Sequence, residues 1–198
     1  KLNNGGKKLD DGTVTVPAGF ENHNARFALI EIVNIFDTGL TFEPIHRVLF
    51  NIKPLDIINA IKDNLNGTVS EVSSKENLID TVKNSSADFG FVFTENGSQK
   101  YVLLKTEIKE LAVARLQPVI DNFLKSVNAS KDQIDYIHGT EEVFRLGAKE
   151  NTVAVLLPPV AKDSFFATIN SRGPLPRKSF SMGEADEKRF YLECRKLF

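Results

Sequence analysis

Hydrophobic and polar positions in the first half of the chain alternate between spacing typical of strands and spacing typical of helices. Apolar runs predict strands at residues 27–36 and 40–50, and the turn-forming residues 37–39 between them favour a hairpin. The rest of this half predicts, in order, a helix opened by Pro54, a strand at 68–72, a helix whose capping box begins at Ser73, and strands at 87–94 and 100–105 joined through Asn96-Gly97. These elements predict an α+β lobe with a mainly antiparallel sheet.

The second half of the chain has a different pattern, in which short strands and helices alternate. Apolar residues at helical spacing predict a helix that ends at Asn128, in which Pro118 fits only in the first turn. A β-α-β-α series follows, with strands at 133–138 and 152–157 and helices at 140–148 and 163–172. Two strands separated by a short helix are most easily parallel. The predicted fold class is therefore α+β, that is, mixed α/β.

The pattern divides the chain into three parts. Residues 1–25 are polar and rich in Gly and predict a flexible lead-in, residues 26–110 form the α+β lobe, and residues 111–198 form an α/β lobe packed on the first as one compact unit. At 198 residues with 41% hydrophobic content, the chain is long enough for a substantial core. The start contains neither an initiating Met nor a signal-peptide core, so we expect the sequence to begin inside a longer protein.

Composition narrows the functional classes. The net charge of −1 argues against a general affinity for nucleic acid or membranes, and no apolar run approaches the ~20 residues needed to span a bilayer. One cysteine excludes an internal disulfide framework, and three histidines add too few ligands for a structural zinc site, so no metal is expected. These features predict a cytoplasmic protein.

Ionisable residues interrupt the apolar strand predicted at residues 40–50, where Glu43, His46 and Arg47 stand close together. Adjacent side chains on a strand point to opposite faces, so either His46 or Arg47 must lie mostly among apolar side chains. In a structural interpretation, Arg47 pairs with Glu43 or Glu31 and His46 is a hydrogen-bonded core residue. In a functional interpretation, these residues belong to a site, with His46 as a candidate catalytic residue.

His138 is the second candidate catalytic residue. His138-Gly139 ends a predicted strand and leads into a helix capped by Thr140, and ligands gather beyond the carboxyl ends of parallel strands, where helix N-termini present free N–H groups. His138 can act there as a general acid or base or as a hydrogen-bond donor to substrate. The structural alternative is a histidine that satisfies a loop carbonyl.

The tail from Arg172 to Phe198 is locally basic, with seven Lys or Arg residues and four Asp or Glu residues. Its first loop, between Pro174 and Gly183, contains donors suited to phosphate or carboxylate: Arg177, Lys178, Ser179 and Ser181. The spacing of glycines does not match a P-loop. The alternative interpretation is a solvated basic loop.

Four segments in order resemble a known family. Residues 22–50, centred on Phe42-Glu-Pro-Ile-His-Arg47, are similar to the microbial family called domain of unknown function 1015, and three further segments fit at 135–139, 153–159 and 175–183. The resemblance covers nearly all of residues 20–198. It implies an upstream half with an Asp-Gly-Asn-His or Asp-Gly-His-His-Arg element similar to the ParB and sulfiredoxin-like fold, which includes nucleotide-dependent kinases and nucleotidases. That element does not occur in this sequence.

The resemblance implies that this chain is the C-terminal portion of a ParB-like, nucleotide-dependent enzyme. The nucleotide would be bound mainly by the upstream half, and this portion, inactive alone, would contribute an anion or substrate pocket. The residues assigned to that pocket are Glu43, His46, Arg47, His138, Arg177, Lys178, Ser179 and Ser181. The alternative is a non-catalytic ligand-sensing or protein-interaction domain, and DNA binding by analogy with ParB is disfavoured by the charge distribution.

Overall fold

The computed structural model describes residues 9–11, 13, 15–16, 19–22, 30 and 32–183. The chain divides into two compact units, residues 1–34 with 188–198 and residues 35–187. In the first unit, a short 3₁₀ helix is formed at Phe20–Asn22. Most of the predicted lead-in, and residues 184–198 of the basic tail, lie outside the described residues.

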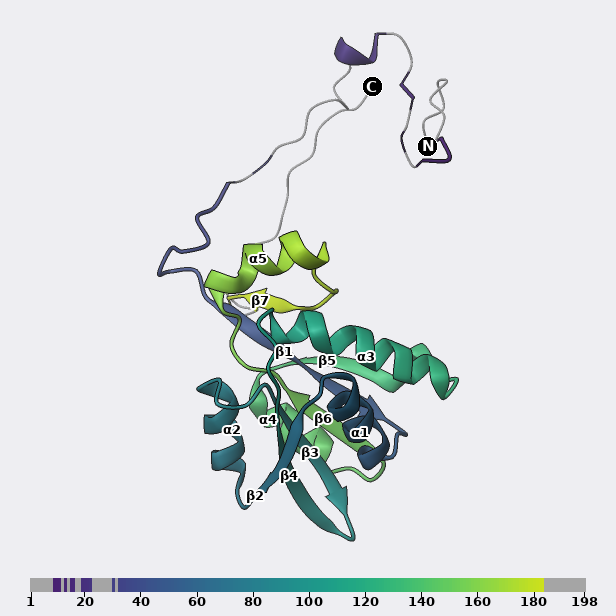
Figure 1. Cartoon of the computed structure of the whole chain (residues 1–198), viewed down its shortest axis with the longest axis vertical. Helices are drawn as coiled ribbons and strands as arrows, with labels where there is room; N and C mark the ends of the chain where they lie inside the picture. The colour runs from purple at the N-terminus through teal and green to yellow at the C-terminus, as the bar shows by residue number, and fades with distance from the viewer. Residues whose placement is uncertain are drawn as a thin grey trace. The chain divides into compact units, whose positions relative to one another are not determined.

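The second unit is built on one seven-stranded sheet, which confirms the mixed α/β class (Figure 1). The strand order is β2-β4-β3-β6-β1-β5, β7 pairs with the start of β1, and each of these pairs is antiparallel. The strands are β1 (Phe42–Phe50), β2 (Thr68–Val72), β3 (Phe89–Glu95), β4 (Ser98–Lys105), β5 (Ile134–His138), β6 (Thr152–Leu156) and β7 (Phe180–Met182). Strands from both halves of the sequence therefore share one sheet.

The predicted hairpin between residues 27–36 and 40–50 is wrong. Its second strand is β1, but residue 30 and residues 32–36 form no strand, and residues 27–29 and 31 lie outside the described part of the chain. β1 instead pairs with β5, β6 and β7, which all come from the other half of the sequence. A central position with partners on both edges explains why most of β1 is buried.

β5 and β6 run in the same direction, as predicted, but they are not neighbours. β1 lies between them and is antiparallel to both. The carboxyl ends of β5 and β6 therefore meet at the same edge of the sheet as the amino end of β1. This arrangement brings residues near positions 43–46, 138 and 157 together.

Helices cover both faces of the sheet. One face packs against α1 (Pro54–Asn64) and α3 (Ala112–Ser126), and the other packs against α2 (Lys75–Lys83) and α4 (Thr140–Gly147). α5 (Lys162–Arg172) lies near β7, where the rings of Phe165 and Phe180 make an edge contact with centroids 5.7 Å apart. Five helices thus stand close to the positions predicted for them.

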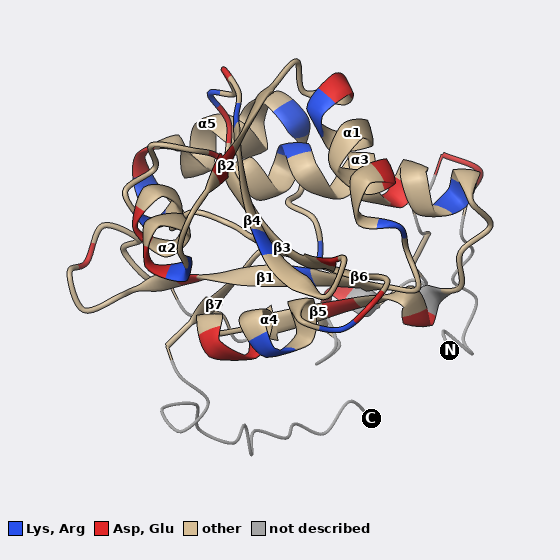
Figure 2. Ribbon diagram, turned by 90° about the horizontal axis from the view of Figure 1, so that it is seen from below, with Lys and Arg blue, Asp and Glu red and all other residues tan. Residues whose placement is uncertain are grey.

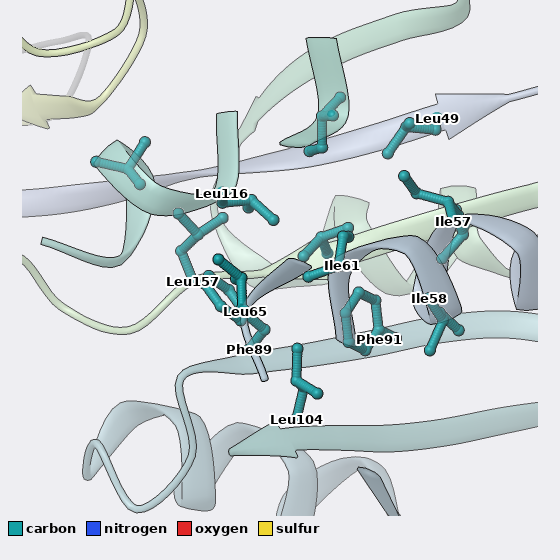
Figure 3. Close-up of a cluster of buried hydrophobic side chains, with 14 of the residues drawn as sticks. Leu49, Ile57, Ile58, Ile61, Leu65, Phe89, Phe91, Leu104, Leu116 and Leu157 are labelled. Carbon is teal, nitrogen blue, oxygen red and sulfur yellow. The ribbon is translucent and has the colours of Figure 1, made fainter. Parts of the chain in front are cut away.

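The core follows the two-residue period of the strands. Leu49 and Phe91 belong to the cluster beneath α1 and α3 (Figure 3), whereas their neighbours Val48 and Val92 belong to the cluster beneath α2 and α4. Burying side chains of this size contributes roughly 1.5–3 kcal/mol each before conformational entropy is subtracted. Because both faces are covered over the middle of β1, the polar side chains at positions 46 and 47 are buried although they point in opposite directions.

Two helix details differ from the prediction. α2 is capped by Ser74 rather than Ser73, since the Ser74 side chain accepts a hydrogen bond from the Asn77 N–H at 3.2 Å. Pro118 lies inside α3 and not in its first turn. The helix begins earlier than expected because the buried residues Val113 and Leu116 draw its first turns onto the sheet, and the Pro118 ring remains exposed.

Candidate functional site

A pocket of about 280 Å³ lies at the edge of the sheet where β5 and β6 end and β1 begins. Its polar lining comes from β1, the end of α2 and the junction of β5 with α4, and consists of Glu43, His46, Lys83, His138 and Thr140. Apolar side chains of α2 and the end of β6 complete the wall. Three of the predicted site residues, Glu43, His46 and His138, are therefore brought together by strands far apart in sequence.

His46 is 3% exposed and is held by a specific hydrogen bond, in which its Nδ1 accepts from the Leu157 N–H at 3.1 Å. Burial, and then the charges of Arg47 and His138, lower the pKa of His46 to about 4. The imidazole is therefore neutral at pH 7. Since Nδ1 accepts, the proton of the neutral ring resides on Nε2, which makes His46 a hydrogen-bond donor in the pocket wall.

His138 is the last residue of β5 and lies opposite Ile45 of β1. The next residue, Gly139, has φ 81°, a left-handed conformation that favours glycine, and it turns the chain into α4. Gly139 and not the predicted Thr140 occupies the N-cap position, and no side chain caps this helix end in the described structure. Backbone N–H groups of the first turn of α4 thus lie beside a pocket that His138 and Thr140 line.

Arg47 points to the face of β1 opposite to that of His46, and its side chain is 0% exposed. Its Nε donates to Gln117 Oε1 at 3.0 Å, its Nη1 donates to the Ile45 carbonyl, and its guanidinium lies 4.8 Å from the centroid of the Tyr136 ring. Burial lowers the pKa of Arg47 to about 10, so the group stays charged at pH 7.

The predicted pairing of Arg47 with Glu43 is wrong, because Glu43 is exposed and Arg47 instead contacts Gln117 and Tyr136. Glu31 lies outside the described residues. The expectation that only one of His46 and Arg47 is surrounded by core is also wrong. Both are buried because helices cover both faces of β1.

The basic loop meets Arg47 rather than the histidines. Arg177 is exposed, but its Nε donates to the Tyr136 hydroxyl at 3.1 Å and its guanidinium lies 5.3 Å from the same ring centroid. Lys178 is exposed, with φ 57°. The hydroxyl of Ser179 donates to the Pro176 carbonyl, and that of Ser181 donates to the Gly183 carbonyl at 3.2 Å.

The predicted site residues thus form two separate groups, and within β1 the neighbouring side chains of His46 and Arg47 point to opposite faces of the sheet. Glu43, His46 and His138 line the pocket, whereas Arg177 joins Arg47 at Tyr136. Neither Arg177 nor Lys178 is among the residues that line the histidine pocket. Figure 2 shows basic and acidic residues interspersed over the helices around these groups.

Three participants were not predicted from the sequence: Lys83, Gln117 and Tyr136. Gln117 had a detectable signal, because it stands on the inward face of α3 between Val113 and Ile120, where an apolar residue is expected. A polar residue at such a position indicates a buried polar partner. Lys83 and Tyr136 carried no comparable signal.

A larger cavity, of about 680 Å³, lies at the ends of β2 and β4 and includes Glu110 and Arg115 in its lining. Glu110 Oε1 lies 3.7 Å from Arg115 Nη1 and 3.1 Å from Arg172 Nε, so Glu110 forms ion pairs with both arginines. We place the candidate site at the smaller pocket, because three of the predicted site residues line it. Among the described residues, no group of three or more His, Cys, Asp or Glu residues is arranged to hold a metal ion.

Within the described residues, no helix has both the length and the apolar character required to cross a membrane. A search among curated proteins found no match. A family model described as "Protein of unknown function (DUF1015)" matches residues 10–126.

Several solved structures share the fold. A conserved hypothetical protein from Pyrococcus furiosus aligns with a TM-score of 0.52 and 13% identity, covering 78% of this chain and 61% of its own. A mutant free serine kinase in complex with AMP aligns with a TM-score of 0.51 and 15% identity, covering 77% of this chain and 58% of its own. A complex of a mutant of that kinase with ADP has a TM-score of 0.50 and 12% identity, with 77% and 58% coverage. This chain therefore spans about three fifths of the length of these proteins.

Proposed function

The chain belongs to the DUF1015 family, whose description assigns no activity, and we propose that it forms part of a ParB-like, nucleotide-dependent enzyme of the kinase or nucleotidase class. In this proposal it contributes the pocket that receives the substrate. The nucleotide is bound mainly by an upstream half of a longer protein.

The single observation that carries the proposal is the convergence of Glu43, His46 and His138 on one pocket. Its volume of about 280 Å³ suits a small metabolite rather than a nucleotide with its base, sugar and phosphates. Lys83 supplies a positive charge and Glu43 a negative one, so the lining complements a small ligand that carries both an anionic and a cationic or hydroxyl group.

The chemistry of the lining supports phosphoryl transfer or hydrolysis. Such reactions need positioning and charge stabilisation more than covalent chemistry from the protein. The neutral His46 acts as a fixed donor, held in one tautomer by the Leu157 N–H. In this proposal His138 or Glu43 accepts a proton from a substrate hydroxyl, and Lys83 stabilises charge on the phosphoryl group; all three line the pocket.

The similarity to the serine kinase supports the nucleotide part of the proposal. The structures named above contain AMP or ADP, and this chain covers only 58% of that kinase. A division of labour in which another part of the longer protein holds the nucleotide agrees with that coverage.

Calorimetric titration of this chain, and of a longer protein that includes the upstream half, tests the proposal. We expect ADP to bind only the longer protein, and L-serine or phosphate to bind with affinities that fall at least about tenfold in Lys83→Gln and His138→Gln. Lys149→Gln removes an exposed lysine that does not line the pocket and serves as the matched control. Unchanged affinities in both pocket variants would refute the assignment of this site.

The alternative is a non-catalytic ligand-sensing domain. It is favoured by the chemistry of the lining, because Lys83 can bind an anionic group without any catalytic step. A small anionic ligand that binds the isolated chain and the longer protein equally, with no nucleotide turnover in either, would support sensing over catalysis.

A further inference from the structure

The buried guanidinium of Arg47 is incompletely satisfied. Nε and Nη1 donate to Gln117 and to the Ile45 carbonyl, but Nη2 makes no hydrogen bond. In the part of the chain that the structure describes, Nη2 is the one buried side-chain nitrogen or oxygen atom left in this condition. A buried donor without an acceptor is costly, and a buried charge without a counter-charge more so.

The charges around Arg47 do not balance. Arg177 brings a second guanidinium to the same Tyr136 ring. The carboxylate that raises the pKa of Arg47, Asp121, is exposed and reaches it only through Gln117, whose Nε2 donates to Asp121 Oδ1 at 2.9 Å. No ion pair of the described residues includes Arg47. Among the residues that the structure describes, these two cations thus share one indirect, solvated counter-charge.

We propose that Arg47 Nη2 binds a monatomic anion of the chloride class on the α3 face of the sheet, with Arg177 adding to the local positive charge. The Arg47 side chain has no exposed surface, so an anion bound at Nη2 must be enclosed by the protein, which favours a monatomic anion over phosphate and carboxylates. A water molecule would accept the hydrogen bond from Nη2 but would leave the positive charge uncompensated. A halide accepts the hydrogen bond and also compensates the charge. This site is separate from the histidine pocket, whose lining includes neither Arg47 nor Arg177.

Thermal unfolding of the whole chain in sodium chloride, sodium bromide or sodium gluconate, at equal ionic strength, tests the proposal. Equal ionic strength removes general screening, and gluconate is too large for the site. We expect chloride and bromide to raise Tm by about 3 to 5 °C over gluconate, with saturation as the halide concentration increases.

Three arginine variants test whether the halide-dependent rise in Tm arises from binding at Arg47. Arg47→Met should abolish the halide-dependent rise, and Arg177→Met should reduce it. Arg145→Met removes the same charge from an exposed position on α4, where Arg145 pairs with Glu142, and should keep the full rise. If Arg47→Met does not fold, Arg177→Met and a crystal grown in bromide decide the question.

In the bromide crystal, an anomalous peak is expected within hydrogen-bonding distance of Arg47 Nη2. The proposal is overturned if the wild-type Tm is equal in chloride and gluconate, if Arg47→Met or Arg177→Met retains the full rise, or if the crystal shows only water beside Nη2.

Discussion

Replacing His46 by Gln should remove a specific pH dependence from the stability of the fold. His46 is buried, its Nδ1 accepts the Leu157 N–H at 3.1 Å, and its pKa is lowered to about 4. A Gln amide oxygen can accept a hydrogen bond but cannot be protonated in this pH range. The comparison therefore isolates the titration of one imidazole.

The magnitude follows from the two pKa values of the imidazole, about 6.5 in the unfolded chain and about 4 in the folded protein. Between pH 6.5 and pH 4 the unfolded chain binds more protons, so the stability of the wild type falls as the pH falls through this window. The two values differ by about 2.5, which corresponds to ~3 kcal/mol over the whole window. His46→Gln should not show this loss.

Urea unfolding at a series of pH values from 7.5 to about 4 measures the effect as the free energy of unfolding of His46→Gln minus that of the wild type. At pH 7 the variant should be less stable by ~1 kcal/mol because its packing is poorer, and towards pH 4 the difference should move by up to ~3 kcal/mol in favour of the variant. His138→Gln, which removes an exposed imidazole from the same pocket and leaves the Leu157 hydrogen bond intact, is the matched control. A difference that is the same at pH 7 and pH 4, or equal pH dependence in both variants, would refute the reasoning.

Three further substitutions test the fold. Gly147→Ala should lower the free energy of unfolding by ~1–3 kcal/mol in urea titrations, because the new Cβ would lie 2.8 Å from the Val92 carbonyl; unchanged stability would contradict this contact. Pro118→Ala should raise the free energy of unfolding by ~1–3 kcal/mol and so raise Tm, since it restores an N–H that can donate to the Ala114 carbonyl at an exposed position inside α3. A lower Tm would contradict this expectation. Gly97→Ala should cost ~1 kcal/mol, measured by chemical unfolding, because φ is 75° in the β3–β4 turn; a stabilised variant would show that the turn does not need glycine.

Most of the local structure could be predicted from the sequence, because helix starts, turns and apolar spacing depend on residues that are close together in the chain. Pro54 at the start of α1, the Asn96-Gly97 turn and the apolar spacing of α4 each act through neighbouring residues, and the helices and hairpin they predict are confirmed. The hairpin predicted before β1 failed for the opposite reason. An apolar run such as 27–36 shows that a segment favours strand geometry, but not which strand it pairs with.

The candidate site shows the same division. The sequence identified Glu43 and His46 because they interrupt a predicted apolar strand, and His138 because it ends another. The sheet topology brings all three to one pocket. It also identified Arg47 and Arg177, but assigned them to that same pocket, whereas the alternation along β1 turns Arg47 to the α3 face. The buried partner Gln117 stands 70 residues from Arg47 in sequence.

The sequence by itself determined most of the elements, the fold class and the family, because periodicity, caps, turn residues and ordered motifs are properties of short segments. Only the tertiary structure decided that β1 is inserted between β6 and β5. That insertion buries both His46 and Arg47, lowers both of their pKa values and separates the predicted site into two groups. The physical reason is that pairing and burial are set by long-range contacts, whose partners no local pattern specifies.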